Sequence, residues 1–202
     1  MNYPGFFDDV PNIILQDPLA EFLGATEHGM IEYSYLDAVK LAGHSCPTVA
    51  GAYLMTRKAL ASLYGDEPPV RGSIRVEFRD GPADGVTGVI ANVVGLLTGA
   101  AQSGGFKGIA GKFDRRDLLH FNAEITGEIR YTRLDSGMNV TVSYHPESVP
   151  PLPAIKELMQ KFVAGIASAE ERIEFGLLWQ ERVKRILIDN ADNPELVIVA
   201  GG

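Results

Sequence analysis

The sequence has a single cysteine, no basic N-terminal region and no apolar run of transmembrane length. One cysteine excludes an internal disulfide framework and is typical of a reducing compartment. The first 19 residues lack the basic start and long apolar core of a secretory signal. The longest uncharged stretch, residues 85–106, is interrupted by glycines, whereas a membrane span needs about 20 apolar residues. We therefore expect a cytoplasmic protein without a membrane partner.

Positive charge is also scarce. The 202 residues include 18 Lys and Arg against 26 Asp and Glu, so the net charge is −8. Nucleic-acid binding needs clustered basic side chains, and we expect no nucleic-acid partner. The chain is 46% hydrophobic and 22% charged, which is typical of a folded protein with a substantial core. Its length suits one large domain or one domain with additional helices.

Hydrophobic periodicity predicts an α+β fold, with a mixed or antiparallel sheet packed with helices. We divide the chain into an α+β domain, residues 1–150, and a helical C-terminal extension, 151–202, which packs on that domain or on a second copy in a dimer. The segment ELVIVAGG is consistent with a short last strand. The predicted helices cover residues 14–24, 34–43, 47–64, 84–97, 153–166 and 169–190, and the predicted strands cover 73–80, 119–133 and 138–145.

The segment GHSCP places the only cysteine, Cys46, two residues after His44 and directly before Pro47. Proline favours the first position of a helix, and the partial positive charge of a helix N-terminus favours a thiolate. Thiolate and imidazole together suit zinc and other late divalent metals. The same pair is also compatible with a thiolate–imidazolium nucleophile. In a third interpretation Cys46 is a small packing residue and His44 caps a helix end.

Several motifs resemble the FmdE-like family, which takes its name from a component of formylmethanofuran dehydrogenase. GHSCPTVAGAY resembles its metal-site signature F-H-G-H-x-C-P-G-x-x-x-G, with matches at Gly43, His44, Cys46 and Pro47. Residues 76–86 resemble V-E-x-x-x-C-P-V-D-A-I, and LTGA at 97–100 resembles L-T-G-C. The segment 127–142 resembles the family's G-K-x-A-F hairpin. Together the similar segments lie within about residues 35–145.

The chain departs from the family pattern at potential ligands. Ala42 replaces a histidine, and Gly81 and Ala100 replace cysteines. The resemblance therefore implies an open site in which His44 and Cys46 bind one divalent ion, with zinc the ion we expect. Water or substrate would complete the coordination. Some relatives are associated with molybdenum or tungsten oxidoreductases, but the pterin- and cluster-binding cysteines needed for dehydrogenation are absent from this sequence.

Two carboxylates are retained in the second motif. Asp84 is either the N-cap of the helix predicted at 84–97 or a group that orients His44. Glu77 either pairs on the surface with Arg75 and Arg79 or points toward the metal site. The sequence leaves both alternatives open.

Two histidines and one loop complete the set of candidates. His28 and His120 are each either a third metal ligand or a surface histidine. The loop 98–112 is rich in glycine, and its Lys107 and Lys112 are suited to meet an anion. It lacks the spacing of a nucleotide-binding motif, so a plain loop and a substrate lid remain alternatives.

These observations predict a metal-binding protein that acts on or senses a small molecule. The alternatives are a non-metal enzyme that uses a Cys46 thiolate with His44, and a structural dimer with a decayed site. Whether the protein is an enzyme is left open. The broad apolar faces of 153–166 and 169–190, one of which carries Trp179, predict a homodimer.

Overall fold

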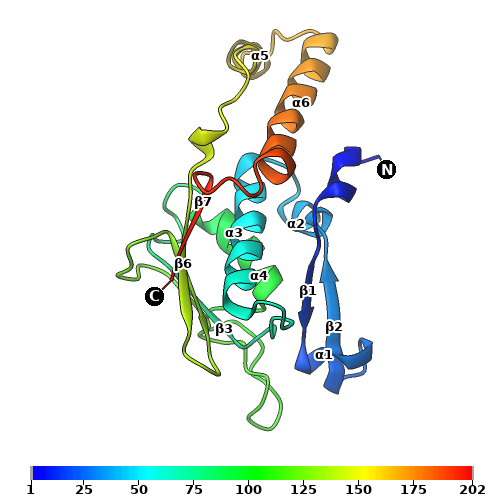
Figure 1. Ribbon diagram of the computed structural model, residues 1–202. Helices are drawn as coiled ribbons and strands as arrows, with labels where there is room; N and C mark the ends of the chain where they lie inside the picture. Colours follow the sequence, from blue (N-terminus) through cyan, green and yellow to red (C-terminus); the bar gives the residue numbers. More distant parts are fainter. Residues whose placement is uncertain (1, 202) are drawn as a thin grey trace.

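The computed structural model describes residues 2–201, which form helices and two β-sheets (Figure 1). The larger sheet has five strands in the order β4-β3-β5-β6-β7. β3 and β4 are parallel, and the other neighbours are antiparallel, so the sheet is mixed. The predicted α+β class is confirmed. The strands are β3 (Ile74–Phe78), β4 (Leu119–His120), β5 (Ile129–Arg133), β6 (Asn139–Tyr144) and β7 (Val197–Gly201).

The long helices lie close to their predicted positions. Ser34 and Asp37 form the capping box that starts the first of them, and Pro47 starts the second. None of the helices in residues 2–201 is both long and apolar enough to cross a membrane. The helices are α2 (Tyr35–Ala42), α3 (Pro47–Tyr64), α4 (Thr87–Thr98), α5 (Ala154–Val163) and α6 (Ala169–Lys184), and α6 continues as a π-turn over Arg185–Asp189.

Helix α3 is the centre of the fold. It lies between the five-stranded sheet and a two-stranded sheet formed by β1 (Ile13–Gln16) and β2 (Met30–Tyr33) (Figure 1). The Tyr53 hydroxyl donates to the carbonyl of Tyr33 at 2.9 Å, and the Thr56 hydroxyl lies 3.1 Å from that of Tyr131 in β5. Most side chains of α3 are buried. This agrees with its sequence, because a helix that is apolar on most faces is typically buried.

The strand register places the start of α3 at one end of the five-stranded sheet. Phe78, the last residue of β3, pairs with Ile129, the first residue of β5. Tyr144, the last residue of β6, donates from its hydroxyl to the carbonyl of Pro47 at 2.9 Å. We call this the cysteine end, because Cys46 lies there directly before α3.

The opposite end contains the start of β3 and the end of α4. The Gly72 N–H, just before β3, donates to the carbonyl of Thr98 at 2.8 Å. We call this the arginine end, because Arg71 and Arg115 meet there on the carboxylate of Asp17.

The chain after residue 150 packs on the preceding part. β7 pairs along β6 and forms an edge of the sheet. Val183, Ile186, Leu187 and Leu196 belong to the same buried cluster as α3. The predicted short last strand is confirmed, whereas α5 and the first turns of α6 project away from the sheet (Figure 1).

The predicted helix at 14–24 is wrong in its first part. Residues 13–16 form β1, with Ile13 and Leu15 buried and Ile14 exposed, which is the alternation of a strand. The helix α1 (Pro18–Phe22) begins only after Asp17, whose carboxylate accepts from the Leu19 and Ala20 N–H groups. β1 forms because β2, another segment that we did not predict as a strand, pairs with it.

Three other boundaries need correction. The predicted strand 119–133 is two strands, separated by a segment in which Asn122 has a φ of 58°. The regular part of the helix predicted over 169–190 ends at Lys184. The helix predicted from Asp84 begins at Thr87, and its N-cap is Val86, which makes no side-chain capping bond.

Candidate functional site

The GHSCP segment is a sharp corner between α2 and α3. Gly43 ends α2 with a φ of 77°, a left-handed conformation in which glycine is strongly favoured. Cys46 is extended and caps α3, and Pro47 occupies the first helical position. Two residues therefore connect the C-terminus of one helix to the N-cap of the next, and both candidate ligands lie at this short connection.

His44 is exposed, and one of its two ring nitrogens is hydrogen-bonded. Its Nδ1 lies 2.9 Å from the backbone carbonyl of Ala42. A carbonyl oxygen only accepts hydrogen bonds, so Nδ1 is the donor, and in the neutral imidazole the free lone pair is then on Nε2. This is the arrangement in which imidazole ligands are commonly held in metal sites.

Cys46 is half-buried at the start of an 18-residue helix. Its sulfur accepts from the Val49 N–H at 3.5 Å, in the position of an N-capping side chain. Burial raises the pKa of Tyr35 and of Tyr144, and negative charge at Cys46 raises both further. The thiol therefore lies close to two phenols that remain neutral at physiological pH.

Ser45 connects the corner to distant parts of the chain. Its hydroxyl bonds the Tyr35 hydroxyl and the Gln180 side-chain oxygen, each at 2.9 Å. Its carbonyl accepts from Trp179 Nε1 at 3.1 Å and from Gln180 Nε2 at 3.2 Å. These contacts hold the residue between the two candidate ligands, and the sequence motif gave no indication of them.

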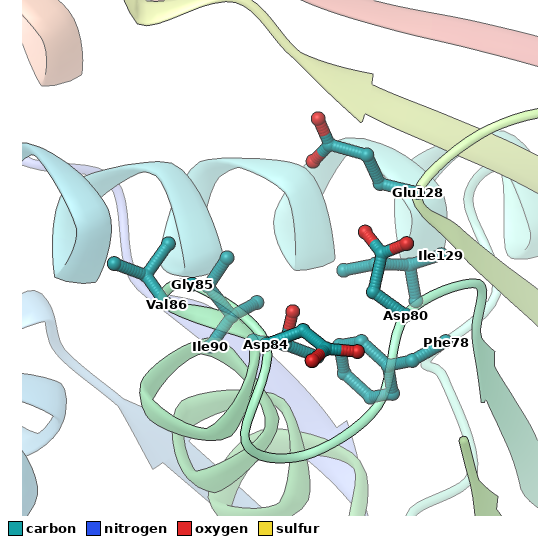
Figure 2. Close-up of a pocket in the computed structure, with 9 residues that line it drawn as sticks. Phe78, Asp80, Asp84, Gly85, Val86, Ile90, Glu128 and Ile129 are labelled. Carbon is teal, nitrogen blue, oxygen red and sulfur yellow. The ribbon is translucent and has the colours of Figure 1, made fainter. Parts of the chain in front are cut away.

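A cavity of about 280 Å³ lies at the cysteine end, beside the start of α4 (Figure 2). Phe78 and Ile129 are among its apolar residues. Asp80, Asp84 and Glu128 contribute carboxylates to its lining. The cavity combines an apolar wall with an excess of negative charge.

Two of these carboxylates are electrostatically different. Burial raises the pKa of Glu128, although the Tyr144 backbone and the Arg79 charge act in the opposite direction. Asp80 binds Arg79 at 2.9 Å, which lowers the pKa of the Asp80 carboxyl. Glu128 is therefore the poorly stabilised charge of this cavity.

Asp84 is not the N-cap of α4. Its carboxylate accepts from the Gly81 N–H at 2.8 Å and closes the turn that precedes the helix. The residue lines the acidic cavity at the cysteine end (Figure 2). Its expected role in orienting His44 stays a prediction.

Glu77 lies on the sheet face opposite to α3. Its neighbours Val76 and Phe78 are buried, and side chains alternate along a strand. Its carboxylate accepts from two nitrogens of Arg130, at 2.6 and 2.8 Å, and lies 3.5 Å from Arg75. These bonds lower the pKa of Glu77 despite partial burial. The carboxylate is engaged in a cross-strand ion pair.

The two other candidate histidines lie in different places. His120 is exposed beside Glu77, with Nε2 bound to the carbonyl of Asp117 at 2.8 Å. His28 is exposed in the turn before β2, with Glu27 at 3.7 Å. Within residues 2–201, no group of three or more His, Cys, Asp and Glu side chains is arranged to hold a metal ion.

No family model matches the chain, and no curated protein is similar to it.

Proposed function

We propose that the protein binds one divalent metal ion through His44 Nε2 and Cys46 Sγ, and that this ion is zinc. The hydrogen bond from His44 Nδ1 to the Ala42 carbonyl carries this proposal. With Nδ1 engaged in this bond, Nε2 of the neutral imidazole is the nitrogen that can bind a metal, and the side chain is exposed. A histidine that capped the last carbonyl of α2 would donate the same bond, so the proposal also draws on Cys46, whose sulfur lies two residues further along at the start of α3. The resemblance of GHSCP to the FmdE-like signature supports the same assignment.

The second donor suits the same ion. A thiolate at a helix N-terminus is stabilised by the partial positive charge of the first turn. Sulfur and imidazole nitrogen are common zinc ligands, but a closed structural site uses four. With two protein ligands the site is open, and its other positions would take water or a small molecule.

An open zinc site supplies Lewis acidity and lowers the pKa of a bound water. The residues of this chain would restrict how a small molecule approaches the ion. Ser45 is held by Tyr35, Trp179 and Gln180, so the backbone between the two ligands is fixed. A protein of this kind acts on or senses a small molecule, as expected for a protein of the FmdE-like type.

Cobalt substitution tests the proposal. A thiolate bound to Co²⁺ gives an intense near-ultraviolet charge-transfer band, which we expect for the native chain. Cys46→Ser keeps a good N-cap, so the helix is preserved while the band disappears. His44→Gln should weaken cobalt binding at least tenfold, whereas His120→Gln, a change at an exposed histidine on the far sheet face, should leave it unchanged.

The alternative assignments give different results. Absence of the band in the native chain, with rapid alkylation of Cys46 that depends on His44, would favour the thiolate nucleophile. Absence of both the band and the fast alkylation would favour a structural role. Either result would contradict the metal proposal.

We also propose that the protein is a cytoplasmic homodimer. The projecting α5–α6 hairpin exposes apolar side chains, including Val163 at 82% and Ile166 at 73%. Ile173 and Leu177 continue this surface beside a groove of about 490 Å³. A second copy that covers the hairpin would remove this apolar area from water. Sedimentation at micromolar concentration should show a species of twice the 21.8 kDa chain mass, and a monomer alone would contradict the proposal.

A further inference from the structure

A second cavity, of about 360 Å³, lies at the arginine end. The lengths of α4 and β3 separate it from the cysteine end. Its lining includes Arg71, Arg115 and Lys112. Lys112 is exposed, whereas Arg115 has only 6% of its surface exposed. Three cationic side chains thus converge on one cavity of a chain whose net charge is −8.

The negative charge at this cavity does not balance the positive charge. Arg71 Nη1 and Arg115 Nη2 share the single carboxylate of Asp17, at 2.9 and 2.6 Å. Asp114 also lines the cavity, but its carboxylate is bound in two places by Arg116, outside the lining. Two guanidinium groups therefore share one carboxylate, and the Lys112 side chain adds a further positive charge to the same lining.

The two arginines differ in how their donors are used. Arg71 directs Nε and Nη2 to the carbonyl of Leu96, at 3.2 and 2.9 Å, so each of its nitrogens has an acceptor. Arg115 donates only from Nη2, and its Nε and Nη1 bond no residue in the described part of the chain. Neither nitrogen is fully buried, and Arg115 belongs to the lining of the cavity. A guanidinium that is more than nine-tenths buried thus keeps unused donors at this site.

Two glycines allow the guanidinium to take this position. A Cβ on Gly72 would lie 2.5 Å from Arg115 Nε, and a Cβ on Gly99 would also overlap the guanidinium. Both glycines have positive φ, 84° and 74°. The backbone on either side is therefore shaped to the arginine, and the group is fixed before any ligand arrives.

We propose that this cavity binds the oxyanion group of a small molecule, a phosphate or a carboxylate, between Arg115 and Lys112. Arg115 supplies fixed donors from Nε and Nη1, and the flexible Lys112 ammonium closes over the anion. Hydrogen bonds from charged donors to oxyanions are among the strongest in proteins. The Ser73 hydroxyl in the same lining adds a neutral donor. This assignment does not depend on the metal proposed at the cysteine end.

Calorimetric titration of the full chain with inorganic phosphate tests the site, with succinate as a second arm and chloride at equal ionic strength as the reference. We expect phosphate or succinate to bind with a Kd on the order of 1 mM or below. Tighter phosphate binding indicates a phosphorylated ligand, and tighter succinate binding indicates a carboxylate. Binding of neither above the chloride reference would overturn the proposal.

Lys112 and Lys107 provide matched variants, since both are exposed lysines of the same loop and only Lys112 lines the cavity. Lys112→Ala should weaken anion binding about fivefold or more, and Lys112→Glu should abolish it. Lys107→Ala should bind as the wild type does. Equal losses for the two alanine variants, or none for Lys112→Ala, would contradict the placement.

The Arg115 Nε–H group gives a direct readout that needs no substitution at the buried ion pair. Its nitrogen–proton NMR signal should shift progressively as phosphate or succinate is added, with the same Kd as the calorimetric titration. A signal that stays in place while the anion binds would place the anion elsewhere and overturn the assignment.

Discussion

The cysteine end and the arginine end of the sheet differ in how charge is matched. At the cysteine end, carboxylates line a cavity, and one of them, Glu128, is destabilised by burial. At the arginine end, two guanidinium groups share the carboxylate of Asp17. The fold thus places the Cys46 sulfur, the His44 imidazole and several carboxylates at one end. At the other end it places Arg115 N–H groups that have no hydrogen-bond acceptor in the described residues. The net charge of −8 therefore describes neither end, because the charges of each end are set by its own buried ion pairs and carboxylates.

The largest expected effect is at Asp17, the carboxylate on which the arginine end depends. Asp17→Asn keeps the N-cap of α1 but leaves Arg71 and Arg115 without a counter-charge. Breaking a buried ion pair typically costs about 3–5 kcal/mol of unfolding free energy. Urea denaturation should show this loss. The corresponding change Asp84→Asn at the cysteine end should cost less than about 1 kcal/mol, because that carboxylate is exposed and accepts a backbone N–H without an ion-pair partner in residues 2–201. Similar costs for the two would remove the distinction between the ends.

The same substitution predicts a pH dependence. Burial raises the pKa of Asp17, but hydrogen bonds from Arg71 and Arg115 outweigh it, and the pKa lies below its ordinary value of 3.8. A lowered carboxyl pKa stabilises the native state above the ordinary value, and that stabilisation is lost as the pH falls through the native pKa. The difference in stability between the wild type and Asp17→Asn should therefore be constant from pH 7 to about pH 5 and shrink below pH 4. A difference independent of pH would contradict the ionic origin.

Tyr144→Phe tests how firmly the cysteine end is held. It removes the hydrogen bond from the hydroxyl to the Pro47 carbonyl and leaves the ring against Gly51. We expect a loss of about 1 kcal/mol, the usual net contribution of one such bond. Hydrogen exchange of the amides at the start of α3 should accelerate by the factor that corresponds to this loss of free energy. The amides at the end of α4 should keep their exchange rates. Equal acceleration at both positions would indicate a general loss of stability instead.

The smallest effect is a gain in stability at Glu128. Burial raises the pKa of this carboxyl, so its ionised form is disfavoured in the native state at neutral pH. Glu128→Gln should stabilise the protein by up to about 1 kcal/mol at pH 7. A raised carboxyl pKa costs stability above the native pKa, and this cost disappears as the pH falls below the ordinary value of 4.5. Denaturation at pH 7 and pH 4 measures the difference, and a loss of stability at pH 7 would show that the charge has a stabilising partner.

Local signals in the sequence predicted much of the fold. The Ser34–Asp37 capping box and Pro47 start their helices because they act on the first turn alone. The alternation of residues 73–80 predicted β3 because one sheet face is buried. The strand β1 was missed because pairing with β2 overrides its helical appearance. The pair Asp17–Pro18, a cap followed by a favoured first residue, was a signal that would have placed the start of α1 correctly.

The candidate site could be predicted only in part, because the sequence shows local motifs but not contacts between distant residues. His44 and Cys46 lie in one short motif, so the sequence shows them together. The contacts of Ser45 with Trp179 and Gln180 join residues more than 130 positions apart, and no local pattern encodes them. The apolar pattern of its helix predicts a dimer surface at Trp179, but the indole N–H of this residue bonds the corner. The pair of Asp17 and Arg115, 98 residues apart, was not readable either.

Zinc stoichiometry tests the central claim most directly, namely that the cysteine end binds a metal cation through His44 and Cys46. Purified chain is loaded with zinc, dialysed and analysed for metal, beside the double variant His44→Gln/Cys46→Ser and the arginine-end variant Lys112→Ala. We predict one zinc per chain for the wild type and for Lys112→Ala, and none for the double variant. No bound zinc in the wild type, or one zinc in the double variant, would contradict the account.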